Sequence, residues 1–344
     1  MKIHGGAPEG FLDFSAPANP LGPPPIAMPI LAESLRSLSR YPNPSYSRLV
    51  KALADFYGFD EDSVVPLNGA AEAYSLVTLA LRPRNIVSVD PTFGDIDDHA
   101  RAVGATRVST CMVARGQRWV LDLANLSRAL ESCRGTCIAI VSIPNNPTGS
   151  VELDKAIDEA LSRGCLVLAD YAFADLSTKR VKVVADDGVI AVFSLTKLLA
   201  LPGLRIGFAV ISDRRIRELI EDARQPWNVN SVAAKFVEIL LSRYGSYLRE
   251  FTELSRNAIL RLRRFLVEGL ERLGLETFDS AAPYVLARHD RMIDIARCLE
   301  RKRVSIRLCS SFKCLDSSYA RISVRPSNEI DELLKEVSCC LEEL

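Results

Sequence analysis

The sequence predicts an α/β protein, with a mainly parallel central sheet covered by helices on both faces and a smaller α+β unit after it. Two observations predict the sheet: continuous apolar runs of strand length, and amphipathic helical stretches that alternate with them. A third observation predicts the smaller unit, because after Pro226 the pattern changes to long helices and short alternating strands. The length of 344 residues also favours two domains over a single core.

The first thirty residues are rich in glycine and proline and contain no regular periodicity. Gly5-Gly6, Pro17, Pro20 and the run from Gly22 to Pro25 all favour turns and loops. We therefore expect residues 1–30 to form an N-terminal arm that lies over another surface.

Residues 31–226 are expected to form the large domain, because helical and strand patterns alternate throughout this stretch. The predicted helices cover residues 45–57, 70–81, 93–103 and 153–163. The predicted strands cover residues 85–90, 136–143, 165–170, 189–194 and 205–211.

Residues 227–344 are expected to form an interdomain helix and a small C-terminal domain. The predicted helices cover residues 229–244, 247–269, 292–301 and 328–341, and the predicted strands cover residues 284–287, 304–308 and 319–324. The strand patterns alternate between polar and apolar residues, as expected when one face of a sheet is solvated.

Charge and cysteine content argue against several classes of partner. Basic and acidic residues number 43 each, so no bulk field favours nucleic acid or a membrane surface. The nine cysteines lack metal-ligand spacing, and the start of the chain has no apolar signal core. We therefore expect a cytoplasmic protein with reduced thiols, no metal, and neither nucleic-acid nor membrane partners.

Lys197 is the first candidate for catalysis, because it follows the apolar run 189–193 and precedes another apolar stretch. Apolar surroundings disfavour the ammonium form, and only a neutral amine attacks an aldehyde to form a Schiff base. The alternative for any single lysine is an ordinary surface loop.

Asp170 and Asn146 follow the ends of two other predicted strands, where the ligand crevice of an open α/β sheet lies. A carboxylate at that edge can pair with a protonated pyridine nitrogen. Taken alone, Asp170 fits a turn cap as well, and Asn145 to Gly149 fits a tight turn.

Two further sequence features suit the binding of a phosphorylated aromatic ring. Asn68 to Glu72 opens a helix with small residues, which leaves backbone N–H groups for a phosphate. Phe93 can stack on a planar ring, although a core position is the simpler interpretation.

The strand 319–325 places Arg321, Ser323 and Arg325 on one face, and Arg307 lies between two apolar residues in an earlier strand. Guanidinium groups suit carboxylate and phosphate, so these arginines can form an anion site. A solvated strand face is the competing interpretation.

In this order and spacing the segments resemble the fold type I pyridoxal-phosphate enzymes of the aminotransferase class I/II superfamily, over nearly the whole chain. The motifs that carry the resemblance are Asn146 before Pro147-Thr148-Gly149, Asp170, Ser194-x-Thr196-Lys197, and Arg205 eight residues later. The resemblance implies that superfamily's fold, pyridoxal 5′-phosphate as cofactor, and a homodimer.

Within the superfamily, Arg40-Tyr41-Pro42 resembles the branch that contains histidinol-phosphate aminotransferase and threonine-phosphate decarboxylase. Three features favour the decarboxylase, an enzyme of cobalamin biosynthesis. They are the N-terminal segments His4-Gly5-Gly6, 12–15 and 19–22; the segment 226–230; and the segments 306–309 and 315–317 followed by Arg321.

The resemblance also implies a role for each candidate residue. Lys197 binds the cofactor as a Schiff base, Asp170 pairs with the pyridine nitrogen, Asn146 bonds the ring hydroxyl oxygen, and Phe93 stacks on the ring. The implied phosphate-binding residues are Ala70, Ala71, Ser194, Thr196, Arg205 and, from the neighbouring subunit, Tyr41. The implied ligands of a small phosphorylated amino-acid substrate are His4, Asn19, Arg307, Arg321 and Arg325.

Four positions depart from the family pattern. Tyr171 stands where glutamate is usual, Phe173 where many transaminases have tyrosine, and Ala71 where a hydroxyl or carboxylate is often found. Pro17 stands where the decarboxylases tend to have asparagine, which removes a substrate contact. The functions that remain open are therefore a phosphothreonine decarboxylase, a histidinol-phosphate or related aminotransferase, and a catalytically idle binding module.

Overall fold

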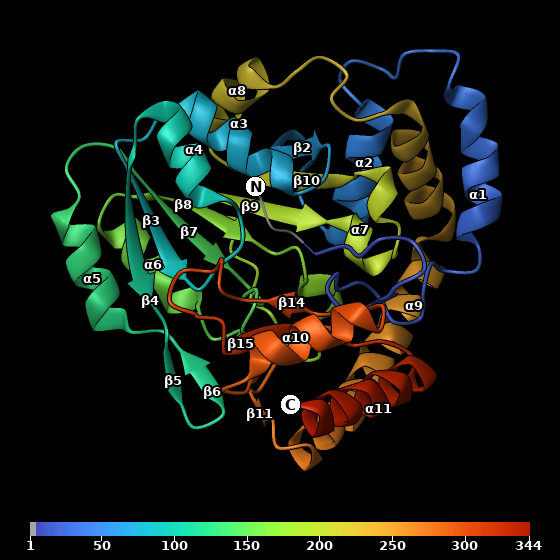
Figure 1. Cartoon of the computed structure of the whole chain (residues 1–344). Coiled ribbons are helices and arrows are strands. Elements are labelled where there is room, and N and C mark those ends of the chain that lie inside the picture. Colours follow the sequence, from blue (N-terminus) through green and yellow to red (C-terminus); the bar gives the residue numbers. More distant parts are fainter. Residues whose placement is uncertain (1–4) are drawn as a thin grey trace.

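The computed structural model describes residues 5–344, which form a seven-stranded central sheet, a smaller four-stranded sheet and the helices around them (Figure 1). The order of strands in the central sheet is β2-β10-β9-β8-β7-β3-β4. Strand β10 runs antiparallel to both of its neighbours, β2 and β9, and the other strand pairs of this sheet are parallel. The prediction of an α/β protein with a mainly parallel central sheet is therefore confirmed.

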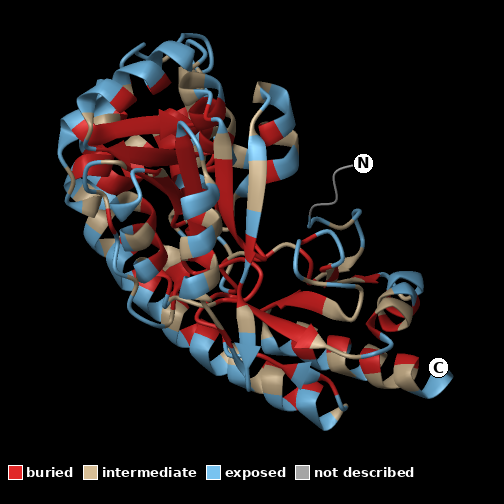
Figure 2. Cartoon of the chain, turned by 90° about the vertical axis from the view of Figure 1, so that its left-hand side faces the viewer, coloured by how far each residue is buried: buried red, intermediate tan, exposed pale blue. Residues whose placement is uncertain are grey.

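The central strands are short and almost entirely buried, which explains their continuous apolar sequences. In order along the chain they are β2 (Val64–Leu67), β3 (Asn85–Asp90), β4 (Thr106–Cys111), β7 (Cys137–Ser142), β8 (Leu166–Asp170), β9 (Val189–Ser194) and β10 (Gly207–Ile211). Figure 2 shows the strands as a buried layer whose flanking helices turn exposed faces to solvent.

Two apolar clusters, one on each face of the central sheet, hold the helices in place. The first cluster contains α3 (Ala71–Leu81), α4 (Ile96–Val103) and α8 (Arg214–Ala223). On the opposite face the larger cluster contains α1 (Ala27–Ser34), α2 (Ser47–Tyr57), α5 (Leu123–Ser132), α6 (Asp154–Ser162) and part of α9 (Ser231–Arg272). No helix among residues 5–344 combines the length and apolar character needed to cross a membrane.

The smaller sheet has the strand order β11-β12-β15-β14 and its own apolar cluster. Its strands are β11 (Glu276–Thr277), β12 (Tyr284–Arg288), β14 (Arg307–Leu308) and β15 (Tyr319–Ser323), and its helices are α10 (Met292–Arg301) and α11 (Ser327–Glu343). Helix α9 contacts elements of both parts (Figure 1). The division of the chain at residues 30 and 226 stays a prediction.

The N-terminal arm is bound to both parts of the chain. Strand β1 (Leu12–Asp13) pairs in parallel with β13 (Val304–Ser305) of the smaller unit. Further along, the backbone N–H of Asn19 donates to the carbonyl of Lys197 at 3.0 Å. The arm therefore connects the smaller unit to the short helix that carries the candidate lysine. Helix α1 begins at Ala27, within the stretch predicted as loop.

Three local differences from the expected elements have clear causes. The two helices predicted after residue 226 form the single helix α9, interrupted by non-helical backbone at Tyr244. The strand predicted over 304–308 splits into β13 and β14, because Val304 and Ser305 pair with the arm while Arg307 and Leu308 pair with β15. The strand predicted from Arg205 begins at Gly207, because Arg205 has a left-handed backbone with φ of 51°.

Six of the nine cysteines form disulfides, so the expectation of reduced thiols is wrong for these residues. The pairs are Cys111–Cys314, Cys137–Cys165 and Cys298–Cys340. Their sequence separations of 203, 28 and 42 residues contain no recognisable spacing, because the fold alone brings the partners together. Cys111–Cys314 joins the end of β4 in the central sheet to the loop between β14 and β15.

Candidate active site

A cavity of about 220 Å³ lies at the carboxyl ends of β7, β8 and β9, beside β14 and β15 of the smaller sheet. This edge of an open α/β sheet is where ligands bind in such folds. The cavity brings together residues that are far apart in the sequence. Those already expected from the sequence are Ala70, Ala71, Phe93, Asn146, Asp170, Ser194, Thr196, Lys197, Arg205, Arg307 and Arg321.

Lys197 lies on the short helix α7 (Leu195–Leu198), which directly follows β9. Burial, together with the positive charges of Arg321 and Arg205, lowers the pKa of its ammonium group to about 8, and the negative charge of Asp170 opposes this shift. Its Nζ lies 5.7 Å from the centre of the Phe173 ring. A substantial fraction of this amine is therefore neutral near physiological pH, as a nucleophile requires.

Asp170 ends β8 and is 5% exposed. Both of its carboxylate oxygens accept hydrogen bonds: Oδ2 from the hydroxyl of Tyr74 at 2.7 Å, and Oδ1 from the backbone N–H of Ala172 at 2.9 Å. Burial raises the pKa of this carboxyl, while the bonds from Tyr74 and Ala172 lower it. The carboxylate is oriented toward a cavity that also contains Lys197, and it can pair with a cationic ring nitrogen there.

Asn146 is held from the opposite side by Arg321. The Nη1 of Arg321 donates to Oδ1 of Asn146 at 2.6 Å, which leaves the amide nitrogen of Asn146 to face other groups. The Nη2 of Arg321 donates to the carbonyl of Ser15 at 2.5 Å. One guanidinium group thus links the Asn146 loop, the N-terminal arm and β15.

A group of hydrogen-bond donors, which we call the donor cluster, consists of Ala70, Ala71, Ser194, Thr196 and Arg205. Within residues 5–344, the backbone N–H groups of Ala70 and Ala71 have no acceptor, as is usual at a helix start. The hydroxyls of Ser194 and Thr196 face each other at 2.9 Å. Backbone donors and the helix dipole at the start of α3 make this a suitable site for a phosphate.

Arg205 reaches the donor cluster because Gly69 leaves room for it. A Cβ atom on Gly69 would lie 2.5 Å from Nη2 of Arg205, and Gly69 itself has a positive φ of 78°. Both observations explain why glycine occupies this position. The sequence indicated that small residues here expose backbone N–H groups, but it did not indicate the close approach of Arg205 to Gly69.

Arg307 and Arg321 lie directly opposite each other on the antiparallel strands β14 and β15. Both side chains are almost completely buried, at 7% and 5% exposure, and burial lowers the pKa of both guanidinium groups. Like charges directly opposite in neighbouring strands are destabilising. The arrangement is therefore suited to an anionic ligand that lies between or beside the two groups.

Two expected substrate ligands have other roles in the structure. The side-chain nitrogen of Asn19 donates to the Leu198 carbonyl at 3.0 Å and to Ser255 Oγ at 2.8 Å, and its oxygen accepts from the N–H of Leu21. Asn19 therefore anchors the arm and does not line the cavity. Arg325 lies beyond the end of β15 and pairs with Glu329 at 2.8 Å, outside the cavity.

Tyr41 and His4 stand apart from the cavity for different reasons. Tyr41 is 79% exposed and packs only against Trp227 among aromatic partners in the described chain, with ring centres 4.5 Å apart. It does not line the cavity of its own chain. His4 lies outside the described residues.

Sequence reasoning missed three aromatic residues of this region. Tyr74 binds Asp170, Tyr284 lies 5.5 Å beneath the Arg321 guanidinium, and Phe312 lies 5.1 Å from the Arg307 guanidinium. A buried tyrosine needs a hydrogen-bond partner, so Tyr74 in an apolar helix stretch was a detectable signal. Phe312 has no comparable signal, because it lies in an irregular loop.

The sequence also matches a known protein family. Residues 10–337 match the family described as aminotransferase class I and II. The chain belongs to this family. Enzymes of the class I and II aminotransferase family depend on pyridoxal 5′-phosphate, which is therefore the cofactor of this chain.

The class I and II relatives include two kinds of enzyme. The chain is 30% identical to a threonine-phosphate decarboxylase of Salmonella typhimurium, over 96% of this chain and 92% of the relative. It is also 30% identical to a histidinol-phosphate aminotransferase of Mycobacterium tuberculosis, over 92% of this chain and 84% of the relative. Sequence identity therefore does not choose between the two reactions.

Solved structures show the same fold type I architecture. A histidinol-phosphate aminotransferase from Clostridium acetobutylicum matches with a TM-score of 0.85 and 22% identity, over 96% of this chain and 99% of that one. An L-threonine-O-3-phosphate decarboxylase from Porphyromonas gingivalis matches with a TM-score of 0.77 and 23% identity, over 92% and 95% of the two chains.

The residues of the cavity fit the family cofactor. Lys197 has a lowered pKa, Asp170 is a buried and oriented carboxylate, and the donor cluster supplies backbone and side-chain donors for a phosphate. These three features match an aldehyde, a pyridine nitrogen and a phosphate group respectively.

Proposed function

We propose that the chain catalyses the pyridoxal-phosphate-dependent decarboxylation of L-threonine O-3-phosphate, which releases carbon dioxide and aminopropanol phosphate in cobalamin biosynthesis. The observation that carries the proposal is the directly opposed, buried pair of Arg307 and Arg321. Phosphothreonine carries two anionic groups near its amine, whereas histidinol phosphate carries only its phosphate. Two buried cations therefore suit the former better.

In this proposal four residues and the donor cluster hold the cofactor. Lys197 binds it covalently, Asp170 pairs with its ring nitrogen, and Asn146 bonds its ring hydroxyl oxygen. Phe93 packs against the ring, and the donor cluster binds the phosphate. When bound, the cofactor would supply an electron sink for a bond that breaks at the substrate α-carbon.

The arginines then select the bond that breaks. Arg307 and Arg321 would hold the phosphate and the carboxylate of the substrate, so that the bond between the α-carbon and the carboxylate is the one aligned for cleavage. Loss of carbon dioxide would leave an electron pair on the α-carbon. The ammonium form of the Lys197 side chain would supply the proton that replaces the carboxylate there.

We also propose that the active unit is a homodimer in which Tyr41 reaches the cofactor phosphate of the neighbouring subunit. The support is the exposure of Tyr41 and its position beside Trp227, away from the cavity of its own chain. A large exposed aromatic pair is unusual unless another surface covers it.

A product assay separates the two candidate reactions. Phosphothreonine incubated with enzyme and cofactor, without a keto acid, is expected to give carbon dioxide and aminopropanol phosphate in equal amounts. The transaminase alternative is favoured by the histidinol-phosphate aminotransferases among the relatives. It predicts instead that histidinol phosphate reacts only through 2-oxoglutarate, with glutamate as product, and that phosphothreonine loses no carbon dioxide.

A further inference from the structure

Tyr74 connects the start of helix α3 to the buried carboxylate of Asp170. It lies one turn into α3, is 2% exposed, and its hydroxyl donates to Oδ2 of Asp170 at 2.7 Å. We propose that Tyr74 is the positioning residue that orients Asp170 toward the cofactor ring nitrogen and keeps it ionised. This inference rests on the proposed pairing of Asp170 with that nitrogen.

The need for such a donor follows from the surroundings of Asp170. A buried carboxylate tends to take up a proton, and a protonated Asp170 cannot balance a cationic ring nitrogen. The N–H of Ala172 binds only Oδ1, at 2.9 Å, so the Tyr74 hydroxyl supplies the donor to the other oxygen. Lys197 is the nearby cation, and its charge also favours the ionised form.

The ring of Tyr74 is itself fixed by the residues that flank the cofactor site. It packs edge-on against Phe93 with ring centres 6.0 Å apart, and it stacks on His99 at 6.3 Å. A Cβ atom on Gly94 would lie 2.3 Å from the Tyr74 ring, so the turn after Phe93 closes directly onto it. One side chain thus contacts both the ring-stacking residue and the ring-nitrogen partner.

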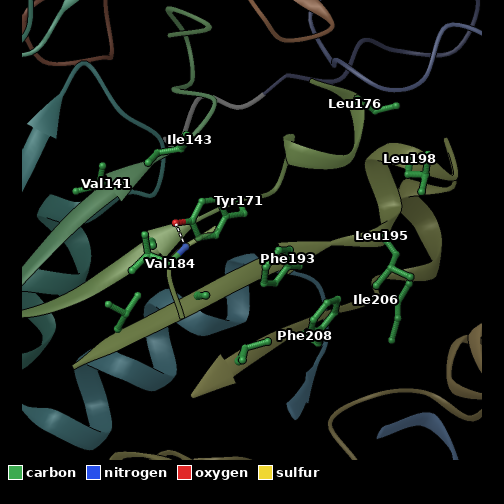
Figure 3. Packing of buried hydrophobic residues seen from close by; sticks show 14 of the residues in the cluster. Val141, Ile143, Tyr171, Leu176, Val184, Phe193, Leu195, Leu198, Ile206 and Phe208 are labelled. Carbon is green, nitrogen blue, oxygen red and sulfur yellow. Dashed lines mark hydrogen bonds between the residues drawn. The ribbon is translucent and has the colours of Figure 1, made fainter. Parts of the chain in front are cut away.

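The chain offers a matched control one residue from Asp170. Tyr171 is 1% exposed, and its hydroxyl accepts from the backbone N–H of Val184 at 3.0 Å. Figure 3 shows it among apolar side chains such as Phe193 and Ile143, in the cluster on the opposite face of the sheet from Tyr74. Phenylalanine at either position removes one buried tyrosine hydroxyl and keeps the ring.

The test compares Tyr74→Phe, Tyr171→Phe and wild type as apo enzymes titrated with pyridoxal phosphate labelled with ¹⁵N in the ring. For Tyr74→Phe we expect the dissociation constant to rise about tenfold or more, as for the loss of a charge-assisted bond. We also expect the ¹⁵N chemical shift to move toward the unprotonated value. Tyr171→Phe is expected to keep the wild-type affinity and shift, although its melting temperature falls.

A double variant separates the loss of the hydrogen bond to Asp170 from a general loss of stability in Tyr74→Phe. In an Asp170→Asn background, Tyr74→Phe is expected to cause no further loss of cofactor affinity, because the carboxylate to which the Tyr74 hydroxyl donates is already absent. The inference is overturned if the ring nitrogen of Tyr74→Phe stays protonated with wild-type affinity, or if the losses add fully in the double variant. If the wild-type ring nitrogen is itself unprotonated, the proposed role of Asp170 fails instead.

Discussion

Residues at the ends of three neighbouring strands define the chemistry of this protein. Asn146 follows β7, Asp170 ends β8, and Lys197 follows β9. The backbone fixes these positions, and the local charges then adjust the reactivity of each group. The pKa of Lys197, lowered to about 8 by burial and by the charges of Arg321 and Arg205, is the clearest case.

The pH dependence of cofactor capture tests this property of Lys197. Only the neutral amine reacts, so the capture rate of the apo enzyme should rise about tenfold per pH unit below pH 8 and level off above it. Removing a neighbouring cation by Arg321→Ala should move the plateau to higher pH. Stopped-flow absorbance measures the capture rate against pH for the wild type and for the variant. The free cofactor titrates identically in both experiments, so a difference between the two curves comes from the protein. An unchanged plateau in the variant would show that Arg321 does not act on Lys197.

Arg321→Ala should also lose turnover of phosphothreonine while it keeps covalently bound cofactor. A lost charge-assisted contact to a buried anion costs roughly 2–5 kcal/mol, or about thirty-fold to several thousand-fold in kcat/KM. Arg325→Ala is the control, because Arg325 pairs with Glu329 outside the cavity. Equal losses in the two variants would contradict the assignment of Arg321 to the substrate.

The sequence predicted the residues at strand ends far better than the residues that support them. Lys197 and Asp170 follow recognisable apolar strands, so their place at the sheet edge could be inferred. Asn19 and Arg325 do not line the cavity, and sequence alone does not show that their side chains bind Ser255 and Glu329. Tyr74 in an apolar helix stretch indicates a buried hydroxyl that needs a partner, but no local pattern identifies that partner as Asp170 on β8.

At the scale of elements, the loop between β2 and α3 is the part most closely adapted to binding. Gly69 has a left-handed backbone and lies against Arg205, and α3 begins at Ala71 without a capping side chain. The buried strands β3, β7, β8 and β9 were predicted because continuous apolar runs of that length fit few other elements. Strand β4 and helix α1 were missed, since the first is a mixed edge strand and the second follows a run of prolines.

Gly69→Ala should weaken binding of the cofactor phosphate. The new methyl group strains the backbone at φ of 78° and displaces the Arg205 guanidinium, so we expect a rise of about tenfold in the dissociation constant of pyridoxal phosphate. Gly58→Ala is a matched control, because Gly58 has the same φ of 78° but open space around it. Absorbance titrations measure both, and similar affinities for the two variants would argue against a role for this turn.

In the whole molecule, covalent and non-covalent links join the smaller unit to the central sheet. The Cys111–Cys314 disulfide and the ion pair between Lys313 and Asp97, at 3.1 Å, both fix the loop that carries Phe312. Phe312 in turn packs against Arg307. The position of a proposed substrate ligand therefore depends on a contact between the two parts of the chain.

Cys314→Ser should lower the stability of the whole molecule. Loss of a disulfide that closes a loop of this length typically costs about 2–4 kcal/mol, so the melting temperature under non-reducing conditions should fall by several degrees. Cys339→Ser is the control, because Cys339 is a free cysteine. Calorimetry of both variants, with and without reductant, checks the prediction. Equal melting temperatures for Cys314→Ser and wild type would mean that this disulfide contributes nothing to stability.

The most direct test of the account is to find the lysine that binds the cofactor. Enzyme loaded with pyridoxal phosphate is reduced with borohydride, digested and mapped by mass spectrometry. Of the ten lysines in the sequence, we predict that Lys197 alone carries the reduced cofactor, and that Lys197→Ala yields no modified peptide. Stoichiometric modification of a different lysine, or an unmodified Lys197 in protein that has bound the cofactor, would contradict the account.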